Sequence, residues 1–357
     1  MARRHANTRI PGPASKDLRA AKAEWSNRLF FSRGKQVPEN FSATALSITR
    51  TAYRSVSPVP ADNVVGVGIG EKMSYGQHTG IWAVKFFVRR KYAPNDIQRK
   101  HLLPKSIGGL EVDVEEAGDF QRFAARKRSV QAATANPRTL IRPAQPGCSV
   151  GFKDPNNLST MAGTFGALVR DKGASFILSN NHVLADEDRL AVNAPIFQPG
   201  LLDDDDVKDD QIAKFSRAIR LKNNNPNKVD CAIAVLQKPS LATKEILKIG
   251  APQGVADATI DMIVHKFGRT SGYTVGRVSS VDTDVTVQYE TGSFTFNEQI
   301  IVVGLSGQPF SAAGDSGSLI VERPSNKAVG LLFGGSPTHT IANHIGDVLK
   351  ALKVSLA

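Results

Sequence analysis

Short runs of β-forming residues recur from about residue 147 to the end of the chain, separated by turns that contain glycine or asparagine. The runs are GTFGALVRD, GASFILSNNHVL, KVDCAIAVL, MIVHKFGRTSGYTVGRVSSVDTDVTVQY, EQIIVVG, SGSLIVE and AVGLLFGG. Regular short strands with few helical patterns between them are typical of an all-β sandwich or barrel. The stretch IGDVLKALKV is amphipathic, and we expect it to form a C-terminal helix packed on the outside.

The first 146 residues have a different pattern. Residues 60–118 contain three strand-like runs, NVVGVGIGEKM, GIWAVKFFVRRKY and GGLEVDVEEAG, with PNDIQRKHLLP as a helix or helical turn before the third. Residues 15–30, SKDLRAAKAEWSNRLF, have apolar residues at helical spacing. We therefore predict four parts: a basic N-terminal arm with one helix (1–57), a small α/β domain (58–120), a basic linker without a convincing strand (121–146) and a β-rich domain (147–357).

The net charge of +12 is concentrated in the front of the chain. Residues 1–150 hold 25 Lys and Arg against 11 Asp and Glu, whereas the remainder holds 20 against 22. No zinc finger, RNA-recognition signature or basic run interleaved with aromatic residues favours nucleic acid as the partner. We expect the basic region to bind a regulatory protein or to dock within the molecule. The acidic run LLDDDDVKDD (201–210) lacks EF-hand spacing, and we expect a solvated loop that can meet this basic region.

The remaining short motifs indicate neither a cofactor nor a structural metal. The two cysteines, Cys148 and Cys231, are too few for a disulfide framework and belong to no cluster with zinc-site spacing. GVGIG at residues 66–70 lacks the continuation of a dinucleotide-binding loop. The N-terminus has no apolar signal-peptide region, and no segment has the roughly 18 apolar residues of a membrane span. We expect a cytoplasmic protein that uses no metal, no cofactor and no membrane.

Three motifs in the β-rich part carry the residue types that acyl transfer requires. SAAGDSGSLIV places Ser316 between glycines, FILSNNHVLAD places His182 after an apolar strand, and NKVDCAIAVL places Asp230 before another strand. Taken singly, each has a structural explanation: a β-turn, a strand-end histidine with satisfied hydrogen bonds, and an aspartate that caps a turn. A serine nucleophile needs an imidazole base, a carboxylate that orients the base, and N–H donors for the oxyanion. The order His, Asp, Ser, with gaps of 48 and 86 residues, is that of the chymotrypsin double barrel.

Residues 147–357 resemble the trypsin-like, chymotrypsin-fold serine peptidases, through the motifs SNNHVL, VDCAIAVL, GDSGSLIV and AVGLLFGGS. A closer likeness is to a subgroup with an extra N-terminal α/β domain, which includes bacterial trypsin-like peptidases and plant narrow-leaf-type proteins. That likeness lies in NVVGVGIGEK, LPKSIGGLEVDVEEAG, GALVRDKGASFILSNNHVLAD, KFGRTSGYTVGRVSSV and TIANHI, and covers most of residues 60–357. The resemblance implies a mainly β fold: a double six-stranded β-barrel of chymotrypsin type, preceded by a small α/β domain and a basic helical arm.

The resemblance also implies roles for individual residues. Ser316 would be the nucleophile, His182 the general base and then acid, and Asp230 the carboxylate that orients it. The backbone N–H groups of Gly314 and Ser316 would form the oxyanion hole, where a side chain at position 314 would crowd the substrate carbonyl. In vertebrate digestive enzymes the aspartate before the serine pairs with a freed N-terminal amine. We expect Asp315 to stabilise the turn without such an amine, rather than after cleavage of the linker near its tribasic stretch, AARKRSVQ (124–131).

The sequence gives little information about substrate specificity. By resemblance, Phe333, Gly334 and Gly335 would line the strand beside the primary pocket, and Phe310 would form its base. An apolar base argues against strict preference for Arg or Lys, and we expect a hydrophobic or medium-sized residue to be accepted. The two histidines of SPTHTIANHI, His339 and His344, are interpreted as loop or surface residues rather than as substrate contacts.

Two functions remain open at this stage. The first is a serine endopeptidase that hydrolyses protein or peptide substrates through an acyl-enzyme intermediate, regulated or partner-activated and forming a homo-oligomer. The second is a non-catalytic binding protein on a protease scaffold that uses the basic front of the chain. A complete set of triad residues favours the first, because a scaffold freed from catalysis has no physical need for all three side chains.

Overall fold

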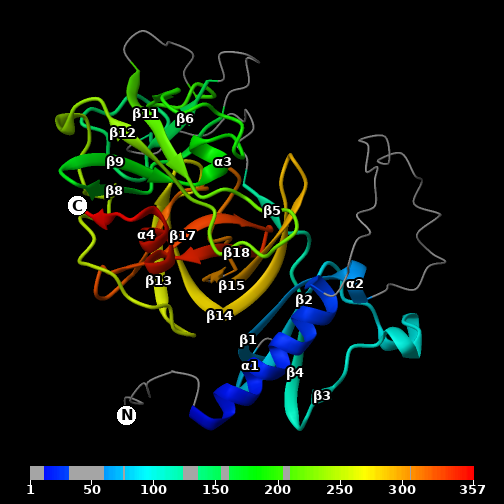
Figure 1. The fold of residues 1–357 in the computed structure, drawn as a ribbon. Coiled ribbons are helices and arrows are strands. Elements are labelled where there is room, and N and C mark those ends of the chain that lie inside the picture. Colours follow the sequence, from blue (N-terminus) through cyan, green and yellow to red (C-terminus); the bar gives the residue numbers. More distant parts are fainter. Residues whose placement is uncertain are drawn as a thin grey trace, which may run out of the picture. The chain divides into compact units, whose positions relative to one another are not determined.

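The computed structural model describes seven stretches of the chain: residues 12–31, 60–74, 77–123, 136–153, 161–203, 210–305 and 307–357 (Figure 1). They form two compact units, which divide between Gly118 and Asp119. The tribasic stretch 124–131, most of the acidic run 201–210 and much of the arm and linker lie outside the described residues. Among those that are described, no helix is both long enough and apolar enough to cross a membrane.

The N-terminal unit packs one helix against a small sheet. The elements are α1 (Gly12–Ser26), which continues as a π-helix (Asn27–Phe31), α2 (Pro60–Asn63), β1 (Val64–Ser74), β2 (Gln77–Val88), β3 (Ser106–Ile107) and β4 (Leu110–Glu116). Strand β2 pairs antiparallel with β1 and parallel with β4. Leu18 and Leu29 are buried in the same apolar cluster as Phe86, whose ring meets Trp25 edge-on at 5.2 Å. The stretch PNDIQRKHLLP forms two short 3₁₀ turns, Pro94–Asp96 and Arg99–His101.

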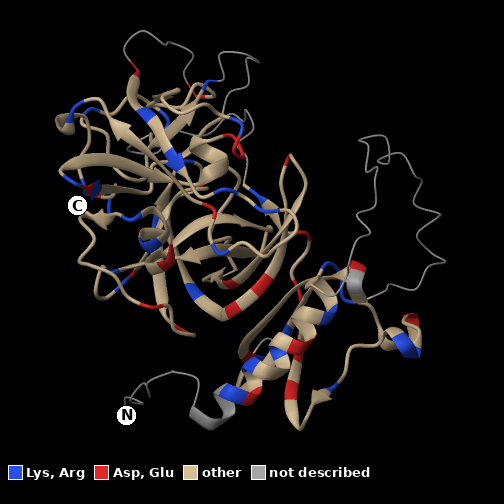
Figure 2. Cartoon of the chain, in the orientation of Figure 1, with Lys and Arg blue, Asp and Glu red and all other residues tan. Residues whose placement is uncertain are grey.

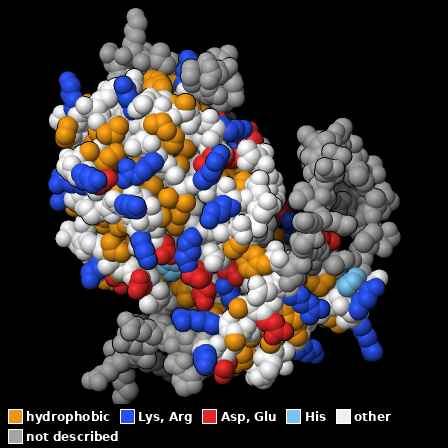
Figure 3. Space-filling view, in the orientation of Figure 1, with side chains coloured by type: hydrophobic (Ala, Val, Ile, Leu, Met, Phe, Trp, Pro, Cys, Tyr) orange, Lys and Arg blue, Asp and Glu red, His pale blue; other side chains and the backbone are white. Residues whose placement is uncertain are grey.

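The described residues of this unit have a smaller positive net charge than residues 1–150 have as a whole. The described residues 12–31, 60–74 and 77–118 contain twelve Lys or Arg and nine Asp or Glu, a net of +3. Helix α1 carries both basic and acidic residues, whereas the charged residues of β4 are all acidic (Figure 2). On the face in Figure 3, Lys and Arg lie scattered among apolar and neutral side chains. The basic excess therefore falls mainly on residues outside those that the structure describes.

The first barrel of the C-terminal unit is a ring of six strands, one of which is interrupted and forms the two elements β7 and β8. Its elements are β6 (Ser149–Phe152), β7 (Gly163–Thr164), β8 (Ala167–Asp171), β9 (Ala174–Ser179), β10 (Pro195–Phe197), β11 (Gln211–Ala218) and β12 (Ala232–Leu236). The run GTFGALVRD is interrupted at Phe165 and Gly166, so β7 pairs with β6 while β8 pairs with β9. The pairs β9–β12, β12–β11, β11–β10 and β10–β6 complete the ring.

The second barrel also closes with six strands, drawn in yellow to red in Figure 1. They are β13 (Ile263–Gly268), β14 (Gly272–Gln288), β15 (Ser293–Gly304), β16 (Leu319–Glu322), β17 (Ala328–Gly335) and β18 (His339–His344). The ring order is β13, β14, β15, β18, β17, β16 and back to β13, with every neighbouring pair antiparallel. Helix α4 (Ile345–Leu352) follows, and β19 (Ser355–Leu356) then pairs with β8 of the first barrel.

Two six-stranded barrels preceded by a small α/β unit confirm the predicted mainly β fold of chymotrypsin type. Two expectations for individual segments were wrong. The linker contains a strand, β5 (Gln121–Arg122), which pairs with β14 and β17. Its polar side chains show no alternation because the pairing uses only the backbone. Asp203, the first aspartate of the acidic run, is not solvated but buried in an ion pair with Arg269.

Candidate active site

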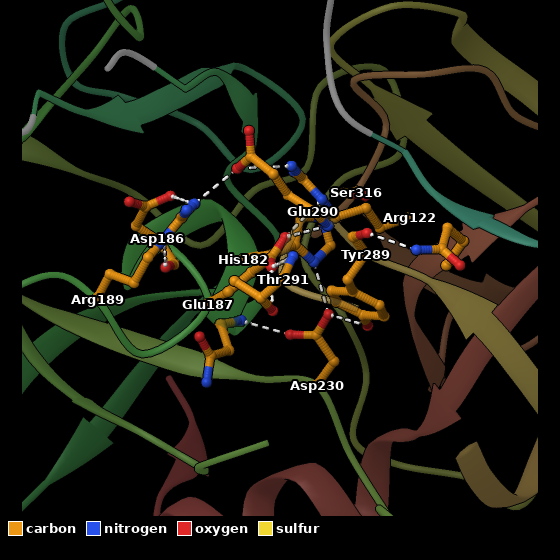
Figure 4. A network of polar contacts seen from close by, with 12 residues as sticks. Arg122, His182, Asp186, Glu187, Arg189, Asp230, Tyr289, Glu290, Thr291 and Ser316 are labelled. Atoms are coloured by element: carbon orange, nitrogen blue, oxygen red, sulfur yellow. Dashed lines mark hydrogen bonds and ion pairs between the residues drawn. The ribbon is translucent and has the colours of Figure 1, made fainter. Parts of the chain in front are cut away.

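His182 and Asp230 meet at the ends of two paired strands. Strand β9 ends at Ser179, and a single helical turn, α3 (Asn181–Leu184), then presents the histidine. Asp230 lies two residues before β12, which pairs with β9 so that Ala232 faces Ser179. Both side chains are fully buried, and Nδ1 of His182 lies 2.6 Å from Oδ2 of Asp230 (Figure 4).

The Asp230 carboxylate accepts hydrogen bonds from three donors. Besides His182, the backbone N–H of Asn181 donates to Oδ1 at 2.7 Å and the hydroxyl of Tyr289 donates to Oδ2 at 2.7 Å. A buried carboxylate is costly unless it is paired, and this set of donors replaces its lost water. Burial, and then the charge of Asp230, raise the pKa of Tyr289, so its hydroxyl stays protonated and remains a donor. Asp230 is therefore a partner of His182 and not the cap of a turn.

Ser316 lies in the turn before β16 and next to α3. A Cβ on Gly163 would lie 2.6 Å from the Val183 side chain and 3.0 Å from the Ser316 carbonyl oxygen, so the helix and the turn meet at one glycine. The Ser316 hydroxyl donates to the Phe333 carbonyl at 3.2 Å. Within the described part of the chain, Nε2 of His182 has no hydrogen-bond partner. The structure thus places His182 against Asp230 and the Ser316 turn beside the helix that carries His182. The Ser316 hydroxyl donates to a backbone carbonyl and not to the imidazole.

Asp315 has a cationic partner inside the barrel. Nζ of Lys266, on β13, lies 3.1 Å from Oδ2 of Asp315, and both side chains are fully buried. The N–H groups of Thr270 and Ser271 donate to Oδ1 at 2.8 and 3.0 Å, and that of Ala312 donates to Oδ2 at 3.0 Å. Burial alone would raise the pKa of Asp315, but the charge of Lys266 and these hydrogen bonds outweigh it, and the pKa lies below its ordinary value. The turn around Ser316 is thus anchored by residues of the folded barrel.

Gly314 has a backbone conformation that favours glycine, and its N–H is already hydrogen-bonded. Its φ of +99° lies in the region that other residues rarely adopt. Its N–H donates to the carbonyl oxygen of Phe123 at 3.1 Å. A carbonyl group therefore already occupies the place that the resemblance assigns to a substrate carbonyl.

The four residues predicted for specificity lie around the same segment. Gly334 and Gly335 pair with Arg122 and Gln121 of β5, and a Cβ on Gly335 would lie 2.9 Å from Cζ of Phe123. Phe310 is buried in the apolar cluster that includes Phe123. The carbonyl of Phe333 is the acceptor for Ser316, as described above.

The expectation for the two histidines of SPTHTIANHI was wrong. His339 and His344 begin and end strand β18, and the first is buried. Nδ1 of His339 lies 2.8 Å from the Thr338 hydroxyl. Burial lowers the pKa of His344, and the charge of Asp347 opposes this effect. The proline and the polar residues around them suggested a loop, but pairing with β15 and β17 places both histidines in the barrel.

A charged network that the sequence did not indicate connects the tip of the β14–β15 hairpin to the loop after α3 (Figure 4). Glu187, whose side chain is 1% exposed, accepts from the N–H of Thr291 at 2.9 Å and lies 2.6 Å from Nε of Arg122. Nη2 of Arg189 lies 2.6 Å from Oε2 of Glu290. This hydrogen bond is the main cause of the lowered pKa of Glu290. These residues are distant in sequence, so no local pattern could have revealed the network.

Comparison with known protein families gives a match to part of the chain. A family model described as the Nal1 C-terminal domain matches residues 239–345, which include Ser316 but neither His182 nor Asp230. No curated protein sequence matched the chain.

Solved structures of serine proteases align with about three fifths of the chain. A glutamic acid specific serine protease, reported to use a histidine triad in substrate binding, aligns at 17% identity with a TM-score of 0.42, covering 60% of this chain and 100% of its own. Protease A of Thermobifida fusca aligns at 15% identity with a TM-score of 0.41, covering 59% and 97%. A Nocardiopsis protease aligns at 16% identity with a TM-score of 0.41, covering 60% and 99%.

Proposed function

We propose that the chain is a serine endopeptidase in which Ser316 is the nucleophile. The observation that carries the proposal is the hydrogen bond from the Gly314 N–H to a peptide carbonyl, in a turn that adjoins the buried His182–Asp230 pair. A peptide carbonyl at this position lies where an oxyanion would be stabilised. Removing one such donor costs about 2.7 to 4 kcal/mol of transition-state stabilisation in related chemistry.

The roles of the three side chains follow from their contacts. Asp230 holds the Nδ1 proton of His182, which leaves Nε2 as the basic atom. Ser316 Oγ then attacks the substrate carbonyl carbon as His182 takes its proton, and the resulting oxyanion accepts from Gly314. When the intermediate collapses, the C–N bond breaks and His182 returns the proton to the leaving amine. A water molecule repeats the sequence on the acyl-enzyme and releases the carboxylic acid.

The alternative, a binding protein without catalysis, is less well supported. A scaffold of that kind would retain a fully buried carboxylate with three donors and an unpartnered imidazole nitrogen without using either.

A fluorophosphonate probe, which reacts with activated serines, tests the proposal. Wild type, Phe123→Ala, Ser316→Ala and Ser325→Ala are treated with the probe and analysed by mass spectrometry. We expect one adduct on Ser316 in every chain except Ser316→Ala, with faster labelling of Phe123→Ala than of wild type, in which the Phe123 carbonyl holds the Gly314 N–H. Ser325 is the matched control, since its hydroxyl contacts only a surface turn. Absence of an adduct from both wild type and Phe123→Ala, each shown to be folded, would contradict the proposal.

A further inference from the structure

Residues 120–123 lie as an extended peptide between two strands of the second barrel. Strand β5 pairs antiparallel with the end of β17, with Arg122 opposite Gly334 and Gln121 opposite Gly335. On its other side Gln121 pairs with Gln288 at the end of β14, and the Gln288 N–H donates to the Phe120 carbonyl at 2.9 Å. Backbone pairing on both sides is how a strand-like ligand is bound at a sheet edge. The segment therefore lies as a peptide substrate of the proposed enzyme would lie.

Phe123 places this segment in register with the catalytic residues. Its carbonyl accepts from Gly314, and its side chain is 9% exposed within the cluster that contains Phe310. The glycine at 335 leaves room for the ring, as described above. The Phe123 carbonyl is thus the one held by Gly314, two residues before Ser316, and its aromatic ring fills the apolar space beside Phe310.

Arg122 occupies a second, charged site. Its Nε lies 2.6 Å from Glu187 and its Nη2 lies 3.3 Å from Glu290, and its side chain is 10% exposed. Buried charges are stable only when paired, so Glu187 would be left without its cation if this segment departed. An incoming peptide with a basic residue at this position restores the pair, and one with an acidic residue opposes Glu187.

We infer that the cleft beside Ser316 recognises peptides in which a basic residue precedes an aromatic one, and that residues 120–123 of the same chain fill this cleft in the resting protein. The inference rests on the proposed function and names its substrate class. A tethered segment competes at an effective concentration on the order of millimolar, so a free peptide binds the resting chain only weakly.

Binding to a chain that lacks the nucleophile tests this occupancy without requiring catalysis. The probe is a fluorescein-labelled, C-terminally amidated peptide, Asp-Phe-Gln-Arg-Phe, with the sequence of residues 119–123. Fluorescence anisotropy is measured with full-length Ser316→Ala and with the same chain carrying Phe123→Ala. We expect at least tenfold tighter binding when Phe123 is replaced. Leu140→Ala on the Ser316→Ala background is the control, since Leu140 is exposed and lies outside the cleft, and it should bind as weakly as the parent.

Because Phe123 also packs in the barrel, Arg122→Ala on the same background is the second release variant. Its side chain is outside that cluster, and its loss should tighten peptide binding several-fold. Circular dichroism establishes that each chain is folded, and intact mass establishes that each is full length. If neither release variant binds the peptide more tightly than the parent chain, the occupancy inference is wrong.

Variants of the peptide test the substrate class on the released chain. Replacing its Arg by Glu, or its final Phe by Ala, should each weaken binding at least tenfold. Equal binding of all three peptides would overturn the specificity inference. Failure of the proposed enzyme is distinguishable: a released chain that binds the peptide, but whose serine-containing counterpart forms no fluorophosphonate adduct, has the recognition without the chemistry. An adduct combined with unchanged peptide binding rejects this inference alone.

Discussion

The three hydrogen-bond donors to the Asp230 carboxylate lie far from Asp230 in the sequence. Asn181 and His182 belong to α3, whereas Tyr289 follows β14. His182 could be predicted because it stands in a motif, and Asp230 because a charged residue precedes an apolar strand. Tyr289 could not, because an aromatic residue at the end of a strand has the same local pattern whether or not its hydroxyl meets a carboxylate. Lys266 and Glu187 escaped prediction for the same reason.

Replacing Tyr289 by Phe removes one of these donors and little else. A hydrogen bond to a charged group contributes about 1.5 to 3 kcal/mol, so we expect the free energy of unfolding to fall by that amount. Urea unfolding measures it. Tyr273→Phe is the control, because that ring is 39% exposed and its hydroxyl meets only His265. Equal stability of the two variants would mean that the Tyr289 hydroxyl does not stabilise the buried carboxylate.

Removing Lys266 leaves Asp315 as a buried carboxylate without its cation. Loss of one partner of a buried ion pair typically costs about 3 to 5 kcal/mol, and we expect this loss of stability for Lys266→Met. Adding Asp315→Asn removes the unpaired charge and should recover part of it. Chemical denaturation of both variants checks the prediction, and a double variant no more stable than Lys266→Met would contradict it.

The same pair predicts how stability depends on pH. The pKa of Asp315 is lower in the folded chain than its ordinary value. Its contribution is therefore complete above the unfolded pKa of about 3.9 and is lost as the pH falls through the folded pKa. Lys266 is the strongest of the influences that lower the pKa of Asp315, so its removal raises that pKa relative to wild type, and Lys266→Met should begin to lose thermal stability at a higher pH than wild type. Parallel pH profiles of the melting temperature would disprove this coupling.

At the scale of elements, predictability followed the length of each strand. The long runs that form β14, β15 and β17 carry enough β-forming residues to be identified from the sequence alone. Strand β5 has two residues, both polar, and exists because two neighbouring strands offer it backbone hydrogen bonds. A segment whose conformation is imposed by its binding site has no periodicity of its own, so the contents of the cleft could not be predicted.

The end of β17 offers a test of the pocket as a unit. Gly335→Val places a side chain against the ring of Phe123. A Cβ there also lies 2.3 Å from the His339 carbonyl oxygen, so circular dichroism must first establish that the variant is folded. We expect kcat/KM for a peptide with an aromatic residue before the cleaved bond to fall at least tenfold, while the small fluorophosphonate still labels Ser316. Gly346→Ala on α4 is the control, because a Cβ there meets open space. Undiminished cleavage by Gly335→Val would show that the aromatic residue binds elsewhere.

Across the C-terminal unit, the last residues connect the two barrels. Helix α4 follows the second barrel, and β19 pairs with β8 of the first, with Leu356 opposite Val169. Deleting residues 353–357 removes this pairing and the hydrogen bond from the Ala357 N–H to the Leu168 carbonyl, and we expect it to cost roughly 2 kcal/mol. The melting temperature of the C-terminal transition should fall by about 4 to 8 °C in calorimetry. An unchanged transition would mean that the barrels are held together without β19.

The ion pair between Lys266 and Asp315 has a consequence for how the proposed peptidase activity of the whole molecule would be controlled. Because the amine belongs to a side chain of β13, folding alone brings it to Asp315 in the turn around Ser316, and we expect no cleavage of the chain to be needed for activity. Under the proposed function, a newly made chain is competent as soon as it folds. An occupant carried on the same chain protects the cell from that moment, and its protection does not weaken on dilution. A separate inhibitor protein would dissociate at the low copy numbers at which an intramolecular one still holds.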